Sequence, residues 1–327
     1  MKVMIIGGAG MVGRKLAARI AGEGLPTGAV SSLILHDIFP PAAPAGAGFP
    51  VDCQTGNAAA PDEAARLAAL RPDVVYHLAA IVSGEAEMDF DKGWEVNARG
   101  LERFLFALRA EHAASGGTYR PRVIFTSSIA VFGAPFPELI GDEFLTAPQT
   151  SYGAQKACCE LMLNDFSRKG FVDGIAIRLP TICVRPGKPN AAASGFFSGI
   201  IREPLNGQEA QLPVPASVVH THASPRSAAR FLTHAAGIAE DALQGRRALN
   251  MPGVGVSVEE QIEALRAVAG QKAVDLIRPA PDEAIMAIVK NWPTRFDPAR
   301  ARALGFEAET SFEEIIRVYL EDDFQGA

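Results

Sequence analysis

Tyr152 and Lys156 could carry acid–base chemistry, because they are four residues apart in the segment 151–156. Residues at this spacing lie on one face of a helix, so the ammonium group would stack beneath the phenol. A free phenol is a poor base at neutral pH, but a nearby positive charge favours the phenolate. The pair could therefore remove a proton from a substrate hydroxyl. Since the same spacing often arises by chance, its meaning depends on the rest of the chain.

A glycine-rich segment at the N-terminus predicts a dinucleotide site. Residues 2–6 are an apolar run typical of a strand, and an amphipathic helical pattern follows residue 11. A strand, a glycine turn and a helix are the context that the dinucleotide fingerprint requires. The glycines let the backbone approach a pyrophosphate, and the helix N-terminus holds its charge. The predicted cofactor contacts in this segment are Gly7, Gly10, Met11, Val12 and Gly13.

Asp37 favours NAD over NADP as the cofactor. It ends a second strand-like run, residues 32–37, close to where the fingerprint places an acid that binds the adenosine ribose. A carboxylate there accepts hydrogen bonds from both ribose hydroxyls and repels a 2′-phosphate. No arginine follows directly to attract such a phosphate. The alternative for Asp37 is a solvated strand end.

Composition and charge exclude several classes of protein. The net charge of −6 gives no electrostatic case for binding nucleic acid or an anionic membrane, and no apolar run is long enough to span a bilayer. The N-terminus enters the first strand at once, so we expect no signal peptide. The four cysteines form no Cys-x-x-Cys pair, which favours free thiols in a cytoplasmic protein. The six histidines lack zinc-ligand spacing, and we predict no metal site.

Strand-like runs alternate with helical patterns through the first half, which indicates a parallel sheet. We predict an α/β fold with a Rossmann-type doubly wound parallel sheet and a smaller, irregular C-terminal substrate domain. The expected NAD-binding domain covers residues 1–180, and residues 217–254 return to it. The expected substrate domain covers residues 181–216 and 255–327. Further predicted elements are strands at 73–78, 122–126, 174–179 and 248–251, and helices at 89–113 and 225–236.

Motifs spread along almost the whole chain carry a family resemblance. They are Gly7-x-x-Gly10-x-x-Gly13, Asp37, His77-Leu78-Ala79-Ala80, Asn97, residues 126–133, Tyr152-x-x-x-Lys156, Arg178-Leu179-Pro180 and residues 296–305. In this order they resemble the extended short-chain dehydrogenase/reductase superfamily. Segments 185–198 and 222–229 resemble, more narrowly, members that oxidise a small sugar acid.

The resemblance implies roles for individual residues. Tyr152 corresponds to the general base, Lys156 to the residue that holds the nicotinamide ribose, and Ser128 to the catalytic serine, with Ser127 as its rival. Asn97 acts indirectly, by tying the central helix to the site through a water. The remaining implied cofactor contacts are Leu78, Ala79, Ala80, Pro180 and Asp52, although a plain loop acid is nearly as good an interpretation of Asp52.

The predicted reaction is oxidation of a hydroxyl of a small polyhydroxy acid, with hydride transfer to NAD. The substrate carboxylate needs a cation, preferably a bidentate arginine. The candidates are Arg185, Arg226, Arg295 and Lys188. Ser83 and Asn190 could bind substrate hydroxyls, as could Ser128 and Tyr152 at the reacting oxygen.

Two other functions stay open at this point. The first is an NAD-dependent sugar-nucleotide epimerase or dehydratase, although Val218 stands where sugar-nucleotide members often carry an arginine that meets the phosphates. The second is a non-catalytic NAD-sensing module, but such proteins tend to lose the tyrosine or the lysine. Relatives commonly dimerise through the helices that hold Trp94 and Tyr152, so we expect a homodimer by analogy.

Overall fold

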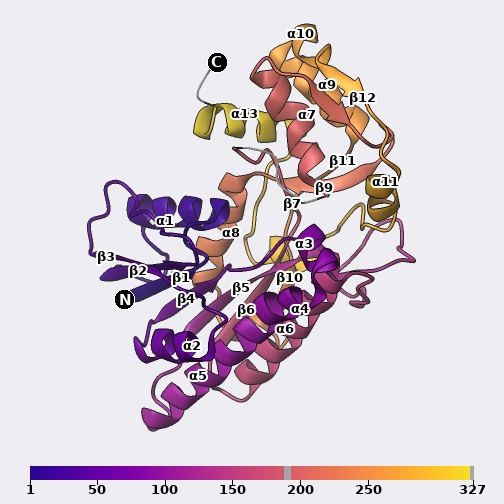
Figure 1. The fold of residues 1–327 in the computed structure, drawn as a ribbon. Coiled ribbons are helices and arrows are strands. Elements are labelled where there is room, and N and C mark those ends of the chain that lie inside the picture. The colour runs from indigo at the N-terminus through magenta and orange to yellow at the C-terminus, as the bar shows by residue number, and fades with distance from the viewer. Residues whose placement is uncertain (188–192, 325–327) are drawn as a thin grey trace.

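The structure is a computed structural model that describes residues 1–187 and 193–324. A seven-stranded sheet forms the larger part of the molecule (Figure 1). Its strand order is β3-β2-β1-β4-β5-β6-β10, and all neighbouring strands are parallel. The strands are β1 (Lys2–Ile6), β2 (Ser32–Asp37), β3 (Val51–Thr55), β4 (Val74–His77), β5 (Arg122–Ser128), β6 (Asp173–Leu179) and β10 (Ala248–Asn250). This doubly wound order confirms the predicted Rossmann-type fold.

Helices cover both faces of this sheet, which explains why its strands are apolar on both sides. In β1, Val3 and Ile5 join one hydrophobic core, while Met4 and Ile6 join the core on the opposite face. The first core includes residues of α1 (Met11–Glu23) and α8 (Pro225–Ala236). The second includes residues of α2 (Pro61–Ala69), α5 (Gly100–Ala114) and α6 (Ser151–Arg168).

The helix expected over residues 89–113 is divided into three segments. A short α4 (Phe90–Gly93) leads into a π-helix, η1 (Trp94–Arg99), before α5 begins. The prediction of one continuous α-helix was therefore wrong over six residues. The wide π-turn contains Asn97, and such turns are frequent at functional sites.

The smaller part of the molecule has its own core and two short sheets. The first sheet joins β11 (Val254–Ser257), β9 (Val219–Ala223) and β7 (Thr181–Ile182), and the second joins β12 (Ile277–Pro279) and β8 (Ala210–Leu212). Its helices include α7 (Gly195–Leu205), α9 (Val258–Ala269), α10 (Gln271–Val274), α11 (Glu283–Val289) and α13 (Phe312–Asp322). Residues 217–254 divide between the two parts, because β10 joins the large sheet while β9 pairs in the small one.

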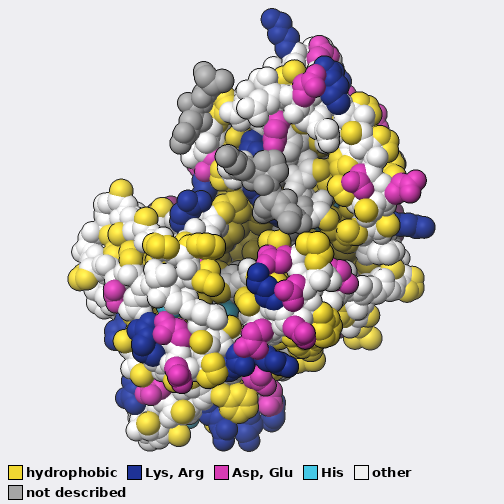
Figure 2. Space-filling model, in the orientation of Figure 1, with side chains coloured by type: hydrophobic (Ala, Val, Ile, Leu, Met, Phe, Trp, Pro, Cys, Tyr) yellow, Lys and Arg dark blue, Asp and Glu magenta, His cyan; other side chains and the backbone are white. Residues whose placement is uncertain are grey.

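A hollow separates the two parts on the face shown in Figure 2, and hydrophobic side chains gather on its floor. The carboxyl ends of the large sheet's strands lead toward the smaller part, since β6 is followed almost directly by β7. Within residues 1–187 and 193–324, no helix has both the length and the hydrophobicity to cross a membrane.

Candidate active site

The predicted cofactor and catalytic residues follow the carboxyl ends of adjacent strands. The glycine turn follows β1, Leu78 follows β4, Ser128 ends β5 and Pro180 follows β6. The strand order reverses between β1 and β4. In open α/β sheets, ligands bind outside the carboxyl ends of the strands at such a switch point.

The glycine turn leaves no room for side chains at two positions. Gly7 has φ +98, and a Cβ there would lie 2.7 Å from the amide nitrogen of Ala79. A Cβ on Gly13 would lie 2.1 Å from the Gly7 carbonyl oxygen. Asp37 accepts a hydrogen bond of 2.9 Å from the amide of Ala9, which fixes its carboxylate beside the turn. A bare backbone at a helix start and an adjacent carboxylate fit a dinucleotide.

The segment after β4 is held by the π-helix. The Asn97 side chain accepts from the Ile81 amide at 2.8 Å and donates to the Ile81 carbonyl at 3.3 Å. It also donates to Gln155 of α6 at 2.8 Å. Asn97 thus links the residues just past Leu78, Ala79 and Ala80 to the helix that carries Tyr152. Ser83 begins α3 (Ser83–Met88) in the same region, and its side chain is partly exposed.

Asp52 lies on the edge strand β3, exposed to solvent. Its carboxylate accepts a hydrogen bond of 2.6 Å from Gln54. This local partner gives Asp52 a structural role that does not require a cofactor.

Tyr152 and Lys156 lie in the first two turns of α6. Thr150 caps this helix by accepting from the amide of Gly153 at 3.1 Å. The Lys156 ammonium lies 5.5 Å from the centroid of the Tyr152 ring and donates to the Thr126 carbonyl at 2.8 Å. Lys156 is almost fully buried. The cation beside the phenol is therefore fixed in position by the neighbouring strand β5.

The two adjacent serines have different surroundings. Ser127 is buried and donates to the Glu160 carboxylate at 2.5 Å. Ser128 is partly exposed, and its hydroxyl accepts from the Ala130 amide at 3.1 Å. That bond leaves the Ser128 proton available to a ligand. Of the two candidates, only Ser128 has a hydroxyl that is both accessible and free to donate.

Glu160 is a site residue that sequence reasoning missed. Its carboxylate forms a bidentate pair with Arg178, at 2.8 and 2.7 Å, besides accepting from Ser127. Glu160 thus links α6 to Ser127 of β5 and to Arg178 of β6, the elements that carry or adjoin the catalytic residues. Because Glu160 is four residues past Lys156, the same helical spacing that selected Tyr152 could have identified it.

The structure separates the candidate cations. Arg226 lies on α8 and is engaged in ion pairs with Glu321, at 2.8 Å, and with Asp322. Arg295 is exposed, beside Gly255 of β11. Lys188 and Asn190 lie outside the described residues.

Arg185 is partly buried next to β7. Its Nε donates to the Ile182 carbonyl at 2.9 Å, and its Nη2 donates to Ser194 at 3.2 Å. Burial lowers the pKa of the Arg185 guanidinium, whereas its neighbours Cys183 and Tyr152 act to raise this pKa. No carboxylate in the described part of the chain forms an ion pair with it. Arg185 is thus a partly buried positive charge without an acidic partner in the described part of the chain, and the charges of Arg185 and Tyr152 are close enough to interact.

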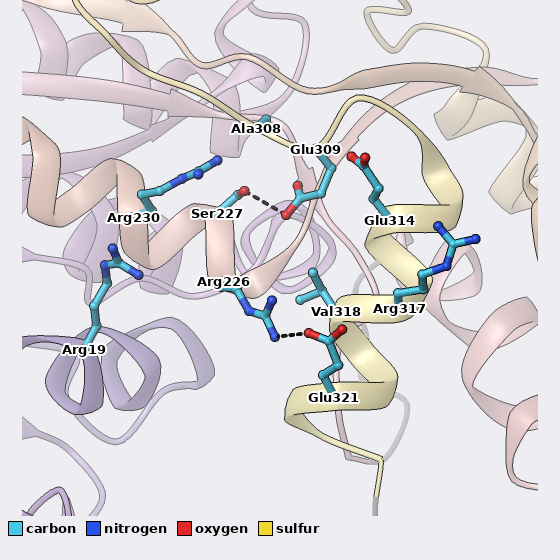
Figure 3. Close-up of a pocket in the computed structure, with 10 residues that line it drawn as sticks. All are labelled: Arg19, Arg226, Ser227, Arg230, Ala308, Glu309, Glu314, Arg317, Val318 and Glu321. Carbon is cyan, nitrogen blue, oxygen red and sulfur yellow. Dashed lines mark hydrogen bonds and ion pairs between the residues drawn. The ribbon is translucent and has the colours of Figure 1, made fainter. Parts of the chain in front are cut away.

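A polar cavity of about 450 Å³ lies elsewhere, among α1, α8 and α13 (Figure 3). Arg226 lines it, with its guanidinium directed at Glu321, and Ser227 faces Glu309. Tyr152, Lys156 and Ser128 do not line it. Within the described ranges no group of His, Cys, Asp or Glu side chains is arranged to hold a metal ion, and the prediction of no metal stays a prediction.

The chain matches the model of the NAD dependent epimerase/dehydratase family over residues 3–236. It belongs to this family. Two similar proteins are named D-erythronate dehydrogenase. The one from Cupriavidus necator is 43% identical over 98% of both chains. The one from Haemophilus influenzae is 40% identical over 99% of this chain and 100% of its own.

Two solved structures are similar to nearly the whole chain. The "nucleoside-diphosphate-sugar epimerase from Agrobacterium tumefaciens" is 58% identical with a TM-score of 0.96, covering 100% of this chain and 95% of the other. A "GalE-like L-Threonine dehydrogenase from Cupriavidus necator" covers 98% of this chain and 100% of the other at 23% identity and a TM-score of 0.82, and thus shares the fold. These matches confirm the predicted family, the NAD cofactor and the assignment as an oxidoreductase.

Proposed function

We propose that this family member oxidises the hydroxyl on carbon 2 of a small sugar acid, D-erythronate first among them, to the 2-dehydro acid. The name of the two curated relatives, which align with this chain from end to end, supports this substrate. NAD, bound along Gly7 to Gly13 and Asp37, would supply the hydride acceptor.

In this proposal the Tyr152 phenolate removes the hydroxyl proton as the carbon–hydrogen bond breaks. Lys156, held by the Thr126 carbonyl, stabilises the phenolate through its charge. Ser128 donates a hydrogen bond to the oxygen as it becomes a carbonyl. General-base assistance of this kind contributes about 10²–10⁴-fold.

The observation that carries the choice of a sugar acid is the environment of Arg185. A desolvated guanidinium is unfavourable unless it meets a negative charge. The charge of Arg185 interacts with that of Tyr152, and no described carboxylate pairs with Arg185. A substrate carboxylate would supply that charge and would place carbon 2, the adjacent atom, beside the phenol.

The test compares Arg185→Ala with Arg226→Ala, a matched loss of one arginine that is already ion-paired to α13. We expect Arg185→Ala to lower kcat/KM for D-erythronate by about 100-fold or more, because a charge-assisted hydrogen bond to the carboxylate is lost. Arg226→Ala should leave kcat/KM within about twofold. NADH absorbance measures both. Equal small losses in the two variants would remove Arg185 from the substrate site.

The rival function is a nucleoside-diphosphate-sugar epimerase, which is favoured by the name of the Agrobacterium tumefaciens protein that is 58% identical. Against it, Val218 packs with the apolar core of the smaller part and offers no charge to a diphosphate. An epimerase reoxidises its cofactor within each turnover. NADH that accumulates with sugar acids therefore supports the dehydrogenase, whereas a UDP-sugar converted without NADH release supports the rival.

We also propose a homodimer that works in the cytoplasm, where thiols such as the partly exposed Cys158 stay reduced. Large apolar side chains are exposed on α6 and on the helices that contact it: Leu161 on α6, and Met88, Phe90 and Phe106 on α3, α4 and α5. A second copy covering them would remove this apolar surface from water. Sedimentation of the wild type and of Leu161→Glu tests the interface, and an unchanged monomer in both would reject it.

A further inference from the structure

Along the chain, Thr181 lies between Leu179, which is the register partner of Ser128, and the proposed carboxylate-binding arginine. Leu179 is paired in register with Ser128, and Thr181 follows two residues later, just past Pro180. On its other side, Ile182 accepts the hydrogen bond from Arg185. Thr181 is partly exposed. A ligand that spans Ser128 and Arg185 would therefore pass close to residue 181.

A buried histidine fixes the direction of the Thr181 hydrogen bond. The His220 Nδ1 atom lies 3.0 Å from the carbonyl oxygen of Pro293, which can only accept, so Nδ1 carries the proton. Burial lowers the pKa of His220 to about 4, so the ring is neutral at neutral pH. Its Nε2 must then be an acceptor. The Thr181 hydroxyl, 2.7 Å from Nε2, donates to it.

The histidine has little freedom to change this arrangement. Its ring is stacked on Phe197, with the centroids 5.3 Å apart and the planes 3° from parallel. Trp292 packs against the same ring at 5.3 Å. The Thr181 proton is thus committed to His220, and only the lone pairs of its oxygen remain for a ligand.

We propose that Thr181 determines substrate specificity by accepting a hydrogen bond from a hydroxyl of the substrate that is not oxidised, and that His220 is the positioning residue that keeps Thr181 an acceptor. This inference rests on the proposed function, and it specifies the substrate class further. The acid must carry a second hydroxyl in the chain beyond carbon 2. A simple 2-hydroxy acid leaves the acceptor unpaired and is selected against.

The experiment measures kcat/KM for D-erythronate and for its two deoxy analogues, 2,4-dihydroxybutanoate and 2,3-dihydroxybutanoate, each with the configuration of D-erythronate. The wild type should disfavour one analogue by about 10-fold or more. Thr181→Val, which keeps the shape but not the oxygen, should lose about the same factor on D-erythronate and almost nothing on that analogue. Thr181→Ser should restore most of the discrimination.

His220→Phe tests the positioning role. It preserves an aromatic ring against Phe197 but frees the Thr181 proton, so discrimination between D-erythronate and the analogue should fall, though less than in Thr181→Val. The Kd for NAD, followed by protein fluorescence, should stay unchanged in every variant. Thermal unfolding identifies variants that fail to fold, and Thr181→Ala then replaces Thr181→Val with the same expectation.

Three results would overturn the inference. Equal losses on all three acids would indicate a merely structural role. A weakened Kd for NAD with intact discrimination would mean that Thr181 binds the cofactor's carboxamide. A His220→Phe enzyme with wild-type discrimination would reject the positioning role. A wild type that oxidises none of the acids contradicts the proposed function itself, a result distinct from the other three.

Discussion

At the scale of single residues, the partners of each side chain separate groups that the sequence leaves equivalent. Ser127 and Ser128 are neighbours of the same type, yet one donates to Glu160 and the other keeps its proton for a ligand. Arg185 and Arg226 are both arginines of the second half of the sequence, yet of the two only Arg226 is ion-paired within the described part of the chain. Chemistry at this site depends on which side chains already have a hydrogen-bond or ion-pair partner within the protein.

Replacing Tyr152 with phenylalanine removes only the oxygen of the proposed base. We expect kcat to fall by about 10²–10⁴-fold, the usual contribution of a general base. The Kd for NAD should hardly change, because the glycine turn and Asp37 are untouched. Steady-state NADH production and fluorescence titration measure the two effects, and a variant that retains a tenth of the wild-type kcat would refute the role.

Residue types and their order predicted most of the candidate site but not its spatial partners. The Gly7 to Gly13 turn and the pair Tyr152–Lys156 are recognisable because their chemistry depends on local spacing. Thr181 and His220 are 39 positions apart in the sequence, and only the pairing of β7 with β9 brings them together. Contacts of that kind depend on tertiary structure and leave no periodic signal in the chain.

At the scale of elements, α6 is positioned by a close contact at its first turn. A Cβ on Gly153 would lie 2.2 Å from the Ala130 carbonyl, in the turn that follows Ser128. The glycine lets the helix start approach β5, so that Tyr152 and Ser128 come together. Sequence patterns predicted the helix but not this contact, since glycine in a first turn also has purely local explanations.

Gly153→Ala should therefore displace the start of α6. We expect the free energy of unfolding to fall by about 1–3 kcal/mol through overpacking, and kcat to fall by up to about 100-fold, because a misplacement near 1 Å has that effect. Urea unfolding and steady-state kinetics measure both. The control is Gly22→Ala in α1, where no atom beyond its chain neighbours and the surrounding helix backbone lies within 4 Å of an added Cβ. A Gly153→Ala enzyme that matches this control would contradict the argument.

The π-helix shows why element boundaries were only partly predictable. The apolar positions of residues 94–108 suit an ordinary α-helix. A single wider turn changes the spacing of these positions too little to be recognised in the sequence. What distinguishes this segment from an ordinary α-helix is the set of hydrogen bonds made by Asn97. The Asn97 side chain bonds to both Ile81 and Gln155.

At the scale of the whole molecule, three buried histidines make stability depend on pH. Burial lowers the pKa of His77 to about 3 and that of His220 to about 4, and it lowers the pKa of His222 well below its ordinary value of 6.5. Between these values and 6.5 the unfolded chain binds protons that the folded chain does not. Stability is therefore full above about pH 6.5 and is lost as the pH falls.

We expect the free energy of unfolding to drop between pH 6.5 and 4.5 by up to about 1.4 kcal/mol per pH unit for each of these histidines. Glu63, whose pKa the Arg66 side chain lowers to about 2, adds its effect only at lower pH. Urea unfolding across this range gives the slope of the unfolding free energy against pH. In His220→Gln this slope should correspond to one fewer proton bound on unfolding. A free energy that stays constant from pH 7 to 5 would show that these rings are not held neutral.

The route of the chain between the two sheets limits how they can move. It leaves the large sheet at Pro180, returns at Ser224 into α8, and leaves again over residues 251–253 between β10 and β11. It returns a second time, because Ala301 and Phe306 pack in the core that includes α1 and α8, and it crosses back before Phe312 of α13. The first three crossings are only one to three residues long, and β7 and β9, which adjoin the first two, are hydrogen-bonded to each other. Neither part is therefore one continuous stretch of sequence, because β10 follows β7, β8 and β9 in the chain but belongs to the large sheet. The two parts should melt in one transition, and any closure over a ligand must be a small rotation that all five chain crossings allow.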